Sequence, residues 1–263
     1  MRRLVLALML VATGEALHSS VAPRTLRVLT YNIHHGEGTD GQIDLPRLAD
    51  VVARVQPDLV ALQEVDQATQ RVGGLNELDE LARRTGLHPV FGKAMDFMGG
   101  GYGVAVLSRW QPLRVHNDPL PGVEEREPRT ALTVELDAGD HGPRLDFTST
   151  HLDQGRDPEL RLAQARSLNA QLVHEDGVAT ILAGDMNARP GSEVMALFDE
   201  YWANAQAGDD PGPVEPTGRP RLRVDYVLLR PAARWQVIES RVLDEPVASD
   251  HRPVLVVLEW TGL

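Results

Sequence analysis

Short apolar runs recur along the chain at the length of β-strands, and most of them end in polar residues. The first, LRVLTYN, covers residues 26–32, and the second, DLVALQEV, covers residues 58–65. Several runs lack a strict alternation of apolar and polar positions, which is typical of strands covered on both faces. By the same pattern we predict further strands over residues 103–108, 129–137, 144–152, 180–184, 223–229, 235–243 and 253–260.

Between these strands, three segments carry apolar residues at the spacing of an amphipathic helix: residues 44–55, 75–86 and 157–175. The third is the clearest, because Asp157 can cap its amino end and Pro158 suits a first helical turn. Many strands with a few helices between them predict a layered α/β fold.

The first residues have a different pattern. Two arginines precede an apolar run over residues 4–12, and small residues follow it. This order predicts a signal peptide and short leader over residues 1–22, with one domain over residues 23–263. A buried amino-terminal helix is the alternative. The apolar run is too short to span a bilayer, so we expect a secreted or periplasmic protein with no transmembrane segment after signal removal.

Composition excludes several classes of functional site. The 263 residues include no cysteine, which excludes disulfides, thiolate metal sites and a thiol nucleophile. The formal net charge of −12 argues against a broad basic surface that follows a phosphate backbone. It does not exclude nucleic acid as a substrate, because a bound metal can offset the charge locally.

Polar residues suited to catalysis or metal binding stand beside the predicted strands. Taken singly, each is more readily explained as a structural or solvated residue, such as a turn residue or a helix cap. Their recurrence along the chain favours one shared site, because ligands of layered α/β folds bind at strand ends. The residues are Asn32, Glu64, His151, Asp185, Asn187, Asp225, Asp250 and His251.

This set contains the parts needed to hydrolyse a phosphate ester. Mg²⁺ prefers oxygen ligands and needs only one or two carboxylates, because it keeps several waters and also binds substrate oxygen. Glu64 and Asn32 supply a carboxylate and an amide oxygen, and Asp250 could contribute from the opposite side.

Histidines supply the proton chemistry. His251 can accept a proton from water if a carboxylate fixes its tautomer. In an extended segment the adjacent Asp250 points to the other face, so Asp225 from another strand is the better partner. His151 and Asn187 can stabilise the charge that develops on the phosphoryl oxygens.

Six motifs then carry a resemblance: TYNIHHG, LQEVD, STHLD, GDMNARP, DYVLL and SDHRPV. In this order, over residues 26–259, they resemble the endonuclease/exonuclease/phosphatase superfamily. That superfamily includes pancreatic-type deoxyribonucleases, abasic-site endonucleases, neutral sphingomyelinases and inositol polyphosphate 5-phosphatases. The resemblance implies a four-layer α/β sandwich, with two packed β-sheets flanked by helices, a metal site at one rim, and residues 23–263 as a single catalytic domain.

The resemblance also implies roles for the metal-binding and water-binding residues. Glu64 matches the principal metal ligand, Asn32 its amide companion, and Asp250 a further metal contact. Asp185 and Asn187 match the pair that orients the attacking water and the phosphate.

The remaining roles concern proton transfer and phosphate binding. His151 matches the histidine that stabilises the phosphoryl group or assists the leaving oxygen, and Asp225 and His251 match an Asp–His dyad. The resemblance leaves open whether His251 or Asp185 is the base. Arg129 either contacts phosphate or is a surface arginine.

The glycine-rich segment FMGGGYGVAVLSR is similar to that of sphingomyelinase-like secreted bacterial members, with Val104 where an asparagine is common. We therefore expect a monomeric, Mg²⁺-dependent phosphodiesterase or phosphatase for small phosphoesters or phospholipid head groups, with Mn²⁺ as an alternative cofactor. A secreted nuclease for DNA or RNA and a non-catalytic binding module are the alternatives. A Ser–His–Asp hydrolase is disfavoured because the chain lacks a GxSxG motif.

Overall fold

The computed structural model describes residues 25–139, 142–173, 177–206 and 212–262. The predicted signal peptide, residues 1–22, lies outside the described residues. Among the described residues, no helix combines the length and apolar character needed to cross a membrane.

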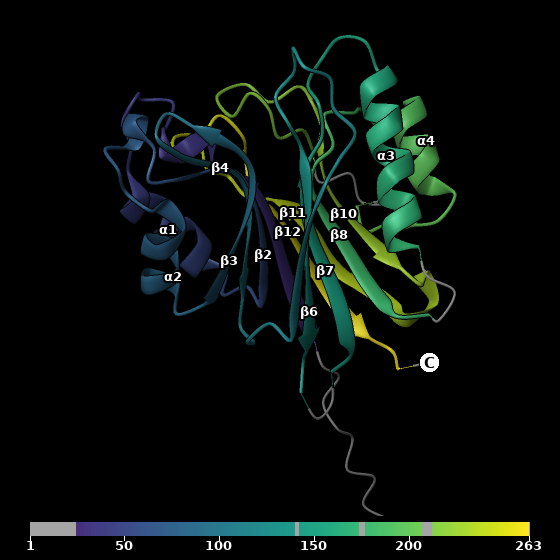
Figure 1. Cartoon of the computed structure of the whole chain (residues 1–263). Helices are drawn as coiled ribbons and strands as arrows, with labels where there is room; N and C mark the ends of the chain where they lie inside the picture. Colours follow the sequence, from purple (N-terminus) through teal and green to yellow (C-terminus); the bar gives the residue numbers. More distant parts are fainter. Residues whose placement is uncertain (1–24, 140–141, 174–176, 207–211, 263) are drawn as a thin grey trace, which may run out of the picture.

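The strands of the described residues form two mixed, six-stranded sheets (Figure 1). The first sheet has the order β11–β12–β1–β2–β4–β3, and the second has the order β5–β6–β7–β8–β10–β9. The strands of the first sheet are β1 (Thr25–Asn32), β2 (Leu59–Gln67), β3 (His88–Phe97), β4 (Gly100–Ser108), β11 (Trp235–Val242) and β12 (Val254–Trp260). Those of the second are β5 (Arg114–Pro119), β6 (Thr130–Asp137), β7 (Arg144–His151), β8 (Ala179–Asp185), β9 (Ala203–Asn204) and β10 (Asp225–Arg230).

Helices cover the outer face of each sheet (Figure 1). Helices α1 (Leu45–Arg54) and α2 (Glu77–Thr85) pack on the first sheet around residues such as Leu48 and Leu81. Helices α3 (Glu159–Leu172) and α4 (Glu193–Asp199) pack on the second around residues such as Leu168 and Phe198. A third apolar cluster, which includes Val256 and Phe147, lies between the sheets. The predicted four-layer α/β sandwich is confirmed.

Two βαβ connections decide where the strands end. Strands β1 and β2 are parallel and are joined through α1, and β7 and β8 are parallel and are joined through α3. Parallel strands deliver their carboxyl ends to the same edge of a sheet. Each sheet therefore has one edge where two successive strands end in the polar residues that the sequence singled out.

Three strands and one helix were not predicted: β3, β5, β9 and α4. Strand β5 is exposed along its whole length at a sheet edge, so it lacks an apolar face. Strand β3 includes Pro89 and Gly92, which are disfavoured in strands. Helix α4 spans only seven residues and β9 only two. These segments are too short to show the repeat of apolar residues that marks a helix or a strand.

Candidate active site

Strand register brings the predicted residues of the first sheet to one edge. Asn32 is the last residue of β1, and Glu64 lies in β2 near the end of its pairing with β1. Strand β12 is antiparallel to β1, with Val254 opposite Thr30. The segment just before β12, which contains His251, therefore reaches the same edge.

The second sheet presents its residues in the same way. His151 at the end of β7 lies opposite Asp185 at the end of β8. Asp225 at the start of the antiparallel β10 lies opposite Asp185 on the other side. The two edges meet, because Asn32 Nδ2 of the first sheet donates to Asp185 Oδ2 of the second at 3.3 Å.

The predicted pairing of Asp225 with His251 is present. His251 Nδ1 lies 2.9 Å from Asp225 Oδ2, and both side chains are buried. Burial disfavours the charged imidazolium, but the carboxylate of Asp225 and its hydrogen bond outweigh burial and hold the pKa of His251 well above its ordinary value. His251 is therefore held in its protonated form.

Asp185 lies between two histidines. Its Oδ2 atom is 3.8 Å from His251 Nε2 and 3.6 Å from His151 Nε2. Burial and then the neighbouring Asp225 raise the pKa of Asp185 to about 6. A carboxyl group with that pKa can gain or lose a proton near neutral pH.

Arg129 fixes the tautomer of His151. Its Nη1 atom donates to His151 Nδ1 at 2.9 Å and forms an ion pair with Glu127 at 2.6 Å. Since a guanidinium only donates, Nδ1 carries no hydrogen, and Nε2 of His151 is the protonated nitrogen. Burial and the charge of Arg129 hold the pKa of His151 well below its ordinary value, so the ring is neutral. The interpretation of Arg129 as a surface residue is wrong, because it is 4% exposed.

A β-bulge aims Glu64 at the rim. The pairing of β2 with β4 shifts between Leu62 and Val65, and Glu64 has a φ of 57°. Asn32 Nδ2 donates to Glu64 Oε1 at 3.0 Å, while Asn32 Oδ1 accepts from the backbone N–H of His34. The amide oxygen predicted as a metal ligand is thus engaged by the backbone, and in this geometry Asn32 positions the Glu64 carboxylate.

Asn187 holds the segment that follows β8. Its backbone N–H donates to Asp185 Oδ1 at 2.8 Å, and its Nδ2 atom donates to the Leu152 carbonyl at 3.0 Å. The residue has a φ of 46°, a conformation in which asparagine is less strained than most residues. These contacts fix the orientation of the Asp185 carboxylate.

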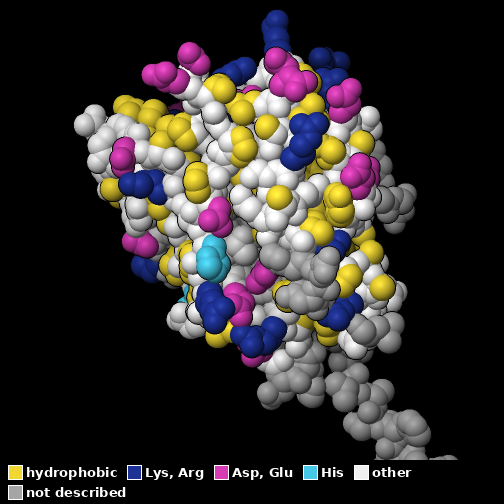
Figure 2. All heavy atoms as spheres, turned by 45° about the vertical axis from the view of Figure 1, so that its right-hand side comes forward, with side chains coloured by type: hydrophobic (Ala, Val, Ile, Leu, Met, Phe, Trp, Pro, Cys, Tyr) yellow, Lys and Arg dark blue, Asp and Glu magenta, His cyan; other side chains and the backbone are white. Residues whose placement is uncertain are grey.

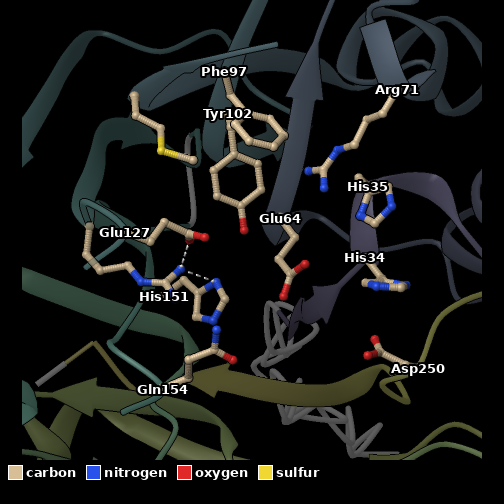
Figure 3. Close-up of a pocket in the computed structure, with 12 residues that line it drawn as sticks. His34, His35, Glu64, Arg71, Phe97, Tyr102, Glu127, His151, Gln154 and Asp250 are labelled. Atoms are coloured by element: carbon tan, nitrogen blue, oxygen red, sulfur yellow. Dashed lines mark hydrogen bonds and ion pairs between the residues drawn. The ribbon is translucent and has the colours of Figure 1, made fainter. Parts of the chain in front are cut away.

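A cavity of about 300 Å³ opens at this rim (Figure 3). Four of the predicted residues line it, namely Glu64, Arg129, His151 and Asp250. Five others do not line it, namely Asn32, Asp185, Asn187, Asp225 and His251. Of these, Asn32 contacts Glu64 and Asp185 contacts His151. Asn187 and His251 contact Asp185, and Asp225 contacts His251. Sequence reasoning missed eight lining residues: His34, His35, Arg71, Met95, Phe97, Tyr102, Glu127 and Gln154.

One wall of the cavity combines a cation with two aromatic rings. The Arg71 guanidinium lies 4.8 Å from the Phe97 ring centroid and 5.4 Å from that of Tyr102. Asp66 holds Arg71 through two hydrogen bonds of 2.7 and 2.8 Å. Nothing in the local pattern marks these residues, because their meeting depends on how β3 and β4 pack beside β2.

Carboxylates and histidines offer more than one metal position. Asp185, Asp225 and His251 place one ligand atom each within 4.8 Å of one another. Glu64 and Asp250 face the cavity from the first sheet (Figure 3). Carboxylate oxygens are the ligands that hard divalent cations prefer, so the residues present fit such an ion.

Fold and site together define a two-sheet α/β sandwich with buried aspartate–histidine chemistry at one rim. Residues 29–251 match the Endonuclease/Exonuclease/phosphatase family, and the chain belongs to that family. The family includes phosphatases, nucleases and phosphodiesterases, generally acts on phosphoester bonds, and typically depends on a divalent metal.

Solved structures with the same fold come from distant organisms. An endonuclease/exonuclease/phosphatase from Beutenbergia cavernae is 26% identical to this chain and has a TM-score of 0.74. The match covers 91% of this chain and 72% of that protein's chain. A mannosyl-6-phosphatase from Bacteroides thetaiotaomicron is 19% identical over 89% of this chain and 100% of its own, with a TM-score of 0.74. The human Nocturnin catalytic domain with bound sulfate is 22% identical, with a TM-score of 0.73. The match covers 91% of this chain and 94% of the Nocturnin chain. A search of curated proteins found no match.

Proposed function

We propose that this protein is a metal-dependent phosphoester hydrolase that acts on small phosphoesters or phospholipid head groups. One observation carries the proposal: a single carboxylate oxygen, Asp185 Oδ2, faces both His151 and His251. Arg129 contacts the Nδ1 atom of His151, and Asp225 contacts the Nδ1 atom of His251. The arrangement gives the buried Asp185 carboxyl group a proton affinity suited to water activation, with a histidine on either side as a hydrogen-bond donor.

Asp185 is the base in this proposal. Its pKa of about 6 leaves it ionised at neutral pH and able to accept a proton from attacking water. His251 is held protonated by Asp225, so it is a poor proton acceptor, and its positive charge favours the ionised form of Asp185. This reasoning favours Asp185 over His251, the two bases that the sequence left open.

Other residues bind and orient the phosphate. The neutral His151 lines the cavity, and its Nε2–H can donate to a phosphoryl oxygen. Glu64 and Asp250 would hold Mg²⁺ or Mn²⁺, and when bound the cation would neutralise charge on the phosphoryl oxygens.

The cavity and the surface support a small substrate. A volume of about 300 Å³ suits a phosphorylated head group or a small ester rather than a duplex. On the face shown in Figure 2, the described acidic and basic side chains are interspersed and form no continuous basic band. With a net charge of −12, the chain lacks the overall positive potential that favours nucleic acid.

A substrate panel with Mg²⁺ tests the function. The panel consists of bis-p-nitrophenyl phosphate, sphingomyelin, an inositol phosphate, a hexose 6-phosphate and plasmid DNA. The hexose phosphate is included because one structural relative is a mannosyl-6-phosphatase. We expect hydrolysis of a small ester or a head group, loss of activity with excess chelator, and recovery with Mg²⁺ or Mn²⁺. Full activity in chelator would contradict the mechanism, and cleavage of DNA alone would favour the nuclease alternative.

His251→Ala separates the two candidate bases. We expect turnover to fall, because the variant loses the positive charge that lies beside Asp185. In the wild type, kcat/KM should rise as the pH increases through about 6, where Asp185 ionises. Without the positive charge of His251, that rise should move to higher pH. An unchanged pH profile in a folded His251→Ala variant would show that Asp185 is not the base.

Export and a monomeric state complete the proposal. Export is supported by the order of charged, apolar and small residues in residues 1–22. Mass spectrometry of the exported protein would locate its amino terminus, and light scattering would give its oligomeric state.

A further inference from the structure

Two adjacent histidines that the proposed reaction does not use, His34 and His35, line the cavity beside Glu64 (Figure 3). Their φ angles are 45° and 43°, and that of Gly36 is 77°. Residues other than glycine rarely adopt this left-handed backbone conformation. Where they do, the surrounding structure holds them in it, often at functional sites. The short turn that follows β1 is therefore held in a strained form.

Specific contacts maintain this turn. Asn32 Oδ1 accepts from the His34 backbone N–H at 3.1 Å, and the Gly36 N–H donates to the Ile33 carbonyl at 2.9 Å. A Cβ at Gly36 would lie 2.9 Å from Leu45 Cδ2, and the φ of 77° favours glycine at this position. The result is that both imidazoles are directed at one cavity.

One residue, Glu37, orients both rings. Its carbonyl accepts from His34 Nδ1 at 3.2 Å, which leaves the lone pair of His34 on Nε2. Its carboxylate lies 3.4 Å from His35 Nε2. The Nδ1 atom of His35 is buried and has no hydrogen-bond partner among the described residues. Metal-binding histidines have this arrangement, in which the outer nitrogen donates to a carbonyl or a carboxylate and the inner nitrogen stays free.

The two imidazoles converge with a carboxylate. One ligand atom from each of His34, His35 and Glu64 lies within 4.8 Å of the other two. The positive charge of Arg71 in the same cavity is balanced by its two hydrogen bonds with the buried Asp66. A cation at this position therefore does not face an uncompensated guanidinium.

We propose that His34, His35 and Glu64 form a binding site for a divalent transition-metal ion of the Mn²⁺, Co²⁺ or Zn²⁺ type. Imidazole nitrogens suit these ions, whereas Mg²⁺ prefers oxygen ligands alone. The site shares Glu64 with the proposed Mg²⁺ position but requires no catalytic step. It therefore extends the proposed function without depending on it.

Titration with Co²⁺ tests the site, because its visible absorption reports nitrogen ligands. We expect the wild type to bind Co²⁺ with a nitrogen-ligated spectrum, and His34→Gln and His35→Gln each to lose that spectrum. Two matched variants should keep it: His116→Gln, on the exposed β5, and His151→Gln, at the opposite wall of the cavity. Circular dichroism establishes that each variant is folded.

Glu37→Gln is the sharper variant. Its side chain is 40% exposed, so the substitution should leave folding intact. Removal of a carboxylate that orients a metal-binding histidine typically weakens metal binding about 10–100-fold, and we expect a loss of that size by calorimetry.

A His34→Gln/His35→Gln double variant that binds Co²⁺ with the wild-type spectrum and affinity would overturn the proposal. Loss of the spectrum in His151→Gln alone would also overturn it, because the ion would then lie beside His151 and Asp185. Hydrolysis is measured separately with Mg²⁺. A wild type that binds Co²⁺ through His34 and His35 but cleaves no phosphoester would refute only the proposed function.

Discussion

At the scale of single residues, two histidines of the site have opposite protonation states. His151 is neutral because it is buried beside Arg129, and His251 is protonated because Asp225 accepts its hydrogen. Both rings are buried, and the difference between them comes from one charged neighbour each, contributed by another segment of the chain. The sequence supplies the histidines but not their neighbours, so their protonation could not be predicted from it.

Glu77 is a second residue whose environment decides its charge. The side chain is fully buried at the start of α2, where its Oε2 atom accepts from the Asp66 N–H at 2.7 Å. Burial raises the pKa of Glu77 from 4.5 to about 8. The folded chain therefore holds a proton that the unfolded chain releases near pH 4.5, and this difference destabilises the fold as the pH rises from about 4.5 to about 8.

Glu77→Gln should remove this dependence. Because glutamine cannot ionise, the variant should gain stability relative to the wild type as the pH rises from 5 to 8, measured as the difference in midpoint of thermal unfolding. Glu80→Gln, on the same helix but partly exposed, is the control and should show no such gain. A Glu77→Gln difference that stays constant between pH 5 and pH 8 would contradict the assignment.

At the scale of elements, two parallel strand pairs and two antiparallel neighbours build the rim. Gly184, the residue before Asp185, has a φ of 153°, and a Cβ there would lie 2.0 Å from the Thr150 carbonyl of β7. The close approach of β7 and β8 at their carboxyl ends therefore depends on glycine, and this approach places His151 opposite Asp185.

Gly184→Ala should separate these strand ends. We expect it to lower the free energy of unfolding by about 1–3 kcal/mol or more, since the overlap is with backbone. Activity should fall as well, because Asp185 moves relative to His151. Gly122→Ala, where a Cβ has its nearest neighbour at 3.9 Å, is the matched control for chemical denaturation. Equal stability of the two variants would refute the argument.

The predictability of the elements follows their burial. Buried strands such as β2 and β8 were predicted because continuous apolar runs mark them, and the polar residues that follow marked the rim. The exposed edge strand β5 carries no such mark. The bulge at Glu64 depends on the register of β4, and the burial of Arg129 depends on its packing against His151, so neither has a local signal. Adjacent histidines at 34 and 35 were visible, but their convergence with Glu64 was not.

At the scale of the whole molecule, the sheets stabilise one another through the apolar cluster between them. Phe147 of the second sheet is fully buried in that cluster, together with Val256 of the first. The hydrogen bond from Asn32 to Asp185 crosses the same interface at the rim. The integrity of the site is therefore tied to the docking of the sheets.

Phe147→Ala should destabilise the protein as one unit. We expect a loss of about 3–5 kcal/mol with coincident transitions by tryptophan fluorescence and far-ultraviolet circular dichroism. Leu113→Ala, at a position that is 51% exposed, should have little effect. Separate transitions by the two signals would show that the sheets unfold independently.

The position of β12 has a consequence for synthesis on the ribosome. This strand lies between β1 and β11 in the first sheet, yet it follows every other strand of the described residues in chain order. A growing chain therefore presents β1 with an open edge until β12 emerges. Asp250 and His251, which immediately precede β12, are also made after all the other site residues. The Asp225–His251 contact therefore cannot form until the segment that precedes β12 has emerged.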